Sequence, residues 1–221
     1  LLASPNKADY NASDFCPQNR ADSPEKNWNA WEKKMTRPMD WVSGAHFIVA
    51  VGQHDIVIRG GGTISGNRDA FGPIAVRDPW KRLTVPMPWR PGEMIWICES
   101  DRITIENVTF LDAPFWTCLL QGCNDIVISN CVLESVCYGV RVGVGNGIMR
   151  NVRVDNIVAR TRVAADIGVN WGLVKAIENI TFSNFTVNSE TAIRIAKSDN
   201  RLKRPETDVL IRDITFRNFK G

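Results

Sequence analysis

A short alternating unit recurs along the chain and constrains the fold more than any other feature of the sequence. Each copy alternates apolar residues with mostly polar ones and ends in Asn or Gly. The copies are DIVIRG from Asp55, RITIEN from Arg102, DIVISN from Asp125, NVRVDN from Asn151, NITFSN from Asn179 and DITFRN from Asp213. A period of two with β-branched residues predicts β-strands. The first apolar residues of successive copies lie 47, 23, 26, 28 and 34 residues apart.

Two further series of strands accompany this unit. A second strand precedes most copies, in MIWICES, TCLLQGC, YGVRVGV, ADIGVNW and TAIRIAK, and a shorter third strand follows the closing Asn. A period of about 25 residues with up to three short strands is typical of a solenoid. A leucine-rich repeat does not fit, because the L-x-x-L-x-L framework is absent. The pattern predicts an all-β fold, a single-stranded right-handed parallel β-helix whose alternate side chains fill a continuous core.

The Asn that closes each unit has a structural explanation. It occurs at positions 107, 130, 156, 184 and 218. Asn adopts the left-handed backbone conformation that a sharp turn requires, and stacked Asn side chains can hydrogen-bond from coil to coil. Asn11, Asn107, Asn179 and Asn184 also begin N-x-[ST] sequons. Most of these sequons fall in the repeat, and we interpret them as by-products of it.

Irregular stretches interrupt the repeat, and we expect residues 1–221 to form a single β-helix domain that carries them. They are an N-terminal segment at 1–45 and inserted loops at 67–93 and 198–208. Most tryptophans lie in or near the first two, at Trp28, Trp31, Trp41, Trp80, Trp89, Trp96 and Trp116. These rings either cap the end coils and seal the core, or stack on the apolar face of sugar rings.

Composition limits the partners that the chain is expected to bind. The net charge is only +3, and no dense basic stripe with interleaved aromatics appears, so nucleic acid is not an expected partner. No apolar run approaches the ~20 residues that span a bilayer. The two His and the lack of CxxC spacing predict no metal site. We interpret the six cysteines as buried free thiols, with a Cys118–Cys123 or Cys131–Cys137 disulfide as the alternative.

The segment GGTISGNRDAFG, followed by WRPGEMIWICESDRITIENVTFLDAPFWTCLLQGCNDIVISNC, resembles the polygalacturonases of glycoside hydrolase family 28. The matching residues are Gly62, Ile64, Gly66, Arg90, Pro91, Pro114 and Trp116. The resemblance covers roughly residues 40 to 220 and implies inverting hydrolysis of α-linked pectic polysaccharides. It further implies an acidic polysaccharide as partner, no cofactor, a monomer, and an extracellular or periplasmic location, although no export signal is visible at the start of the chain.

The chain departs from the family pattern at the catalytic motifs. Inverting hydrolysis needs two carboxyl groups that flank the bond, and the family supplies them from an Asn-Thr-Asp motif and an Asp-Asp pair. Neither follows NDIVISNC. The family's catalytic His aligns with Tyr138, and its Arg-Ile-Lys motif aligns with the segment that starts at Asp166. Our hypothesis is that about two coils of the family's fold have been lost in frame between Asn130 and Tyr138.

The remaining site candidates follow from strand alternation. Val140, Val142, Ile167, Val169, Ile193 and Ile195 should face inward, and Arg141, Asp166, Asn170 and Arg194 outward, as a mixed-charge stripe. Asp166 and Asp112 are the candidate catalytic acids. The candidate substrate-binding residues are Arg141, Tyr138, Gln121, Asn170, Arg194, Lys197, Trp116 and Arg90, because Arg binds carboxylates bidentately. In the alternative interpretation, the stripe is an ordinary sheet face on which Asp166 pairs with Arg141 or Arg194.

Three hypotheses about function remain open at this stage. The first is a pectin-type glycoside hydrolase, and the second is a non-catalytic β-helix that binds acidic polysaccharide, or a truncated remnant. The third is a trimeric β-helix of the phage or adhesin type.

Overall fold

The computed structural model describes residues 1–6, 9, 46–71, 93–114, 116–143, 147–169, 174–197 and 209–221. Within them the chain forms strands and one short 3₁₀ helix, η3 (Arg68–Phe71). The strands are β1 (Ile48–Val51), β2 (His54–Arg59), β3 (Thr63–Ser65), β4 (Ile95–Cys98), β5 (Asp101–Glu106), β6 (Thr109–Ala113), β7 (Cys118–Gln121), β8 (Asn124–Val142), β9 (Gly147–Val169), β10 (Val174–Val187), β11 (Thr191–Lys197) and β12 (Leu210–Lys220).

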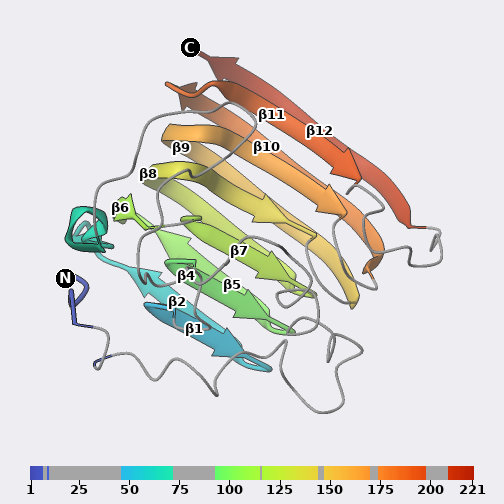
Figure 1. Ribbon diagram of the computed structural model, residues 1–221. Helices are drawn as coiled ribbons and strands as arrows, with labels where there is room; N and C mark the ends of the chain where they lie inside the picture. The colour runs from blue at the N-terminus through green and yellow to red at the C-terminus, as the bar shows by residue number, and fades with distance from the viewer. Residues whose placement is uncertain are drawn as a thin grey trace, which may run out of the picture.

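Successive coils of the chain stack in parallel, and Figure 1 shows them side by side from β1 to β12. The first sheet contains β1, β4, β7, the last residues of β8 and β9, and β11. The second sheet contains β2, β5 and the middle stretches of the longer strands. The third sheet contains β3, β6 and the stretches of β8, β9 and β10 that follow each closing Asn. The predicted all-β parallel β-helix is therefore confirmed.

One series of corners between the sheets lies where the sequence predicted it. Every closing Asn of the repeat, from Asn107 to Asn218, has a φ between 53° and 57°. A second series of left-handed residues stands five positions earlier, where each unit begins, at Asp55, Arg102, Asp125, Asn151, Asn179 and Asp213. Asn and Asp tolerate this conformation best among residues with a side chain. The sequence analysis did not assign a turn to this second series.

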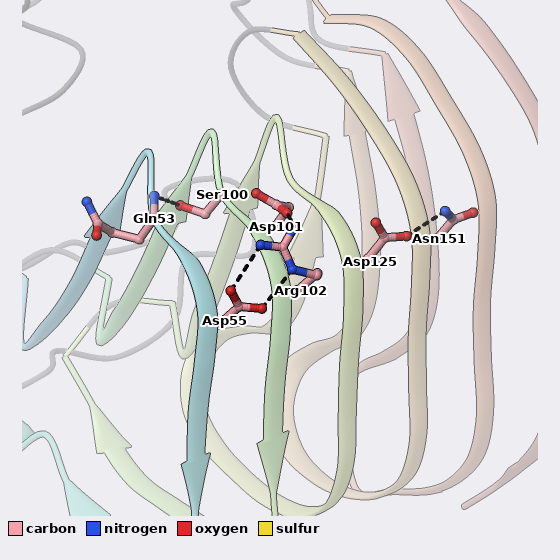
Figure 2. Close-up of polar contacts among 7 residues, drawn as sticks. All are labelled: Gln53, Asp55, Ser100, Asp101, Arg102, Asp125 and Asn151. Atoms are coloured by element: carbon pink, nitrogen blue, oxygen red, sulfur yellow. Dashed lines mark hydrogen bonds and ion pairs between the residues drawn. The ribbon is translucent and has the colours of Figure 1, made fainter.

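Polar side chains join the corners of neighbouring coils. At the closing Asn, the Asn156 amide donates to Asn130 Oδ1 at 2.7 Å, and that of Asn218 to Asn184 at 2.9 Å. The predicted coil-to-coil hydrogen bonds are thus confirmed. At the other corner, Arg102 contacts Asp55 through two nitrogens at 2.7 and 3.0 Å, as Figure 2 shows. The Asn151 amide donates to Asp125 Oδ1 at 2.6 Å in the same view.

Alternate residues of each strand fill the interior. Ile103, Ile126, Val152 and Ile180 pair in register on successive coils, and all are buried. Cys118, Cys123, Cys131 and Cys137 are also buried and form no disulfide, as expected for buried thiols, and neither suggested disulfide is present. Cys16 lies outside the described residues. Burial raises the pKa of the Cys123 thiol to about 11, which keeps this thiol protonated and unreactive near neutral pH.

The last coil shows where one expectation about burial is wrong. Ile193 and Ile195 pair with the buried Ala165 and Ile167, so they have the predicted orientation. Both are nevertheless exposed, because β11 pairs only with β9 among the described strands. Inward orientation buries a side chain only where another coil follows.

The backbone is continuous where the loss of two coils was inferred. β8 runs without interruption from Asn124 to Val142 and pairs with β9 along its length. The register shifts once, between Ser135 and Tyr138. Ser135 lies opposite Thr161, whereas Tyr138 lies opposite Val163, so the interval is one residue longer in β8 than in β9. One extra residue in β8 therefore forms a bulge at the corner between the third and first sheets. The inferred loss itself stays a hypothesis.

Replacing a corner Asn tests the role of the left-handed conformation. We expect Asn130→Ala to lower the free energy of unfolding by about 1–2 kcal/mol, because Ala is strained at a positive φ and cannot accept the hydrogen bond from Asn156. Asn130→Gly keeps the backbone freedom and should cost less. Urea denaturation followed by circular dichroism measures both. Equal losses in the two variants would contradict the conformational explanation.

A carboxylate between two coils should give the fold a pH dependence. Hydrogen bonds from Arg150 at 2.5 Å and Arg212 at 2.7 Å hold the pKa of Glu178 below its ordinary value of 4.5. The stabilisation that these hydrogen bonds give is present above pH 4.5 and is lost as the pH falls through the lowered pKa of Glu178. Glu178→Gln should therefore be less stable than wild type at neutral pH, with the gap closing in acid. A gap that is constant with pH would contradict this, and thermal unfolding across pH measures it.

Candidate functional site

The outer face of the first sheet brings charged residues from three coils into one row. Leu119 pairs with Arg141, Arg141 with Asp166, and Asp166 with Arg194. Their neighbours Val140, Val142 and Ile167 belong to the core, so the strand pleat turns the charged side chains away from it. The parallel register therefore juxtaposes residues that lie far apart in the sequence.

The row points away from the core as expected, but two of its three charged residues are buried. Arg141 is 1% exposed and Asp166 is 0% exposed. Arg141 Nε lies 2.9 Å from Asp166 Oδ2, and Arg194 Nη1 lies 3.4 Å from Asp166 Oδ1. Asp166 thus pairs with both arginines, as the alternative interpretation stated. Arg194 remains partly accessible, with 26% of its side chain exposed.

Two aromatic rings complete the row. The Arg141 guanidinium lies 4.3 Å from the centre of the Trp116 ring and 4.5 Å from that of Tyr138. The two rings meet edge to face at 5.4 Å. Arg194 Nη1 donates to the Tyr138 hydroxyl oxygen at 2.5 Å. Cation–π contacts of this kind are strongest where water is excluded, so the rings and the guanidinium groups hold one another in place.

The β8 bulge adds a residue that the sequence analysis missed. Arg162 stands on β9 between Thr161 and Val163, opposite the extra residue of β8. Its guanidinium lies 5.4 Å from the centre of the Tyr138 ring. We call Arg141, Arg162, Arg194, Asp166, Tyr138 and Trp116 together the arginine cluster. Its three guanidinium groups and single carboxylate leave an excess of positive charge, which favours an anionic ligand.

Gly168 leaves room for the central ion pair. A Cβ atom at this position would lie 2.8 Å from Arg141 Nη2 and 3.0 Å from Asp166 Oδ2. Burial lowers the pKa of Arg141, and the attraction of Asp166 opposes that shift. An arginine remains charged at neutral pH despite such a shift because its ordinary pKa is so high. The pair therefore persists as two buried charges, each of which depends on the other.

The other candidate residues are dispersed. Gln121, buried on the same sheet, accepts a hydrogen bond from Trp96 Nε1 at 2.6 Å. Asp112 lies on β6, in the third sheet, and Arg68 Nη2 lies 3.4 Å from its Oδ1. The two predicted catalytic acids thus stand on different sheets. Arg90 and Asn170, and the side chain of Lys197, lie outside the described residues. The catalytic and substrate-binding roles stay predictions.

The described ranges contain no group of three or more His, Cys, Asp or Glu side chains that could hold a metal ion. In that part of the chain, no helix has the length and apolar character to cross a membrane.

The buried ion pair gives a direct test of the cluster's stability. Asp166→Asn leaves Arg141 buried without its counter-charge and should lower the free energy of unfolding by about 3–5 kcal/mol. The matched control is Asp213→Asn, at an exposed corner position where other coils carry Asn. Chemical denaturation measures both variants. A loss at Asp166 as small as that at Asp213 would contradict the importance of the pair.

Comparisons with known proteins add little to this geometry. No family model matches the chain, and no curated protein matches it either. Among solved structures, a protein from Parabacteroides merdae described as a "putative glycosyl hydrolase" is similar over 99% of this chain and 68% of its own. The two share 14% sequence identity, with a TM-score of 0.40. A likeness this distant does not show the family of the chain.

Proposed function

We propose that this protein binds an acidic polysaccharide of the pectin type on the outer face of its first sheet. The arginine cluster is the observation that carries the proposal. It has an excess of positive charge, and Arg194 is partly accessible from solvent. Guanidinium groups match carboxylates bidentately. A sheet that continues from coil to coil offers a polymer an extended surface.

Hydrolysis of the same polymer is the second candidate activity, and the resemblance to polygalacturonases supports it. An inverting enzyme needs two carboxyl groups about 6.5–9.5 Å apart on opposite sides of the bond. Asp166 is buried in its ion pairs, and Asp112 belongs to another sheet. We therefore place binding ahead of hydrolysis. A polysaccharide ligand would also suit the extracellular or periplasmic location and the monomeric state inferred from the resemblance.

Calorimetric titration with oligogalacturonate tests the proposed binding. We expect the wild-type protein to bind, with an affinity that falls as salt is added. Arg194→Met should weaken binding about ten- to a hundredfold, because it removes a charged hydrogen-bond donor. Arg217→Met is the control, since Arg217 is exposed on the second sheet. No binding by the wild type, or an equal loss in the control, would refute the proposal.

A reducing-sugar assay on polygalacturonate separates the two activities. Binding without release of reducing ends supports a binding protein. Sustained release by the wild type would instead favour the hydrolase, and Asp112→Asn and Asp166→Asn would then test the predicted acids.

A further inference from the structure

One partly buried arginine differs from most of the others because it has no carboxylate partner. Each of the arginines at 59, 68, 102, 141, 150, 153, 160, 194 and 212 has a carboxylate within 4.0 Å. Among the described arginines, Arg162 and Arg217 lack such a partner. Arg217 is exposed, where water solvates its charge, whereas Arg162 is partly buried. Arg162 is thus the described arginine that combines burial with an unpaired charge.

The surroundings of Arg162 satisfy its donors only in part. Its Nε and Nη2 atoms are buried and have no hydrogen-bond partner in the structure. The Tyr138 ring centre lies 5.4 Å from the guanidinium, which donates hydrogen bonds to the Cys137 and Tyr138 side chains. Neither side chain brings a negative charge at neutral pH in its ordinary state. Leaving charged donors unpaired is costly, and no described residue supplies a carboxylate to Arg162.

The other two arginines of the cluster are already engaged. Arg141 lies between Trp116 and Tyr138 and pairs with Asp166. Arg194 donates to Tyr138 and also approaches Asp166. These contacts fix the Tyr138 ring next to Arg162. The excess charge of the cluster is therefore concentrated at Arg162, where the β8 bulge sets the local geometry.

We propose that Arg162 determines the specificity of this site by pairing with a carboxylate of the bound sugar. This inference depends on the proposed function, because it names the residue that distinguishes acidic from neutral sugars. The guanidinium donates to the carboxylate oxygens of the sugar. A methyl-esterified sugar carries no negative charge and cannot form the charged contact with Arg162.

Paired ligands and matched variants test the role of Arg162. The ligands are trigalacturonate and its fully methyl-esterified form, titrated calorimetrically against the full chain. The variants are Arg162→Met, Arg162→Lys and the control Arg160→Met. Arg160 lies two residues earlier on β9 and is already paired with Glu134 at 3.7 Å. Thermal unfolding checks that each variant is folded.

We expect wild type to bind the acid at least tenfold more tightly than the ester. Arg162→Met should abolish that preference by weakening acid binding about ten- to a hundredfold, while ester binding stays unchanged. Arg162→Lys should recover part of the preference through its charge, and Arg160→Met should keep all of it.

The outcomes separate this inference from the proposed function. If wild type binds neither ligand, the proposed function fails, and this inference fails with it. If wild type prefers the acid and Arg162→Met keeps that preference, the function stands and the role of Arg162 is overturned. An equal loss of acid and ester binding in Arg162→Met would show a structural role and would also overturn it.

Discussion

The parallel stacking of coils in register is the constraint on which the rest of the structure depends. It places each residue directly above its counterpart on the next coil, so the core becomes rows of like residues. The corners become ladders of left-handed Asn and Asp, joined from coil to coil by side-chain hydrogen bonds. The same register brings Arg141, Asp166 and Arg194 together although their strands are distant in sequence.

The arginine cluster uses this scaffold in a way that favours a ligand. A buried ion pair costs desolvation and is weak evidence for stability by itself. Here Arg141 and Asp166 instead anchor two aromatic rings, and Gly168 leaves them room. The bulge in β8 sets Arg162 beside the same rings without a counter-charge. Guanidinium groups held in fixed positions are suited to the carboxylate of an acidic sugar.

Strand alternation and the recurring Asn were sufficient to predict the fold and the first series of corners. The outward row at Arg141, Asp166 and Arg194 also followed from alternation, but its burial did not, because burial depends on packing outside the strand itself. Arg160 and Arg162 look alike in the sequence, both polar residues on one strand. Only the pairing of Arg160 with Glu134 and the register shift at the bulge distinguish them.

The central claim is that the outer face of the first sheet is the ligand-binding surface. A crystal structure of the protein with oligogalacturonate tests it most directly. We expect a sugar carboxylate within hydrogen-bond distance of the Arg162 guanidinium. A sugar bound on the second or third sheet, with the arginine cluster unoccupied, would contradict the account.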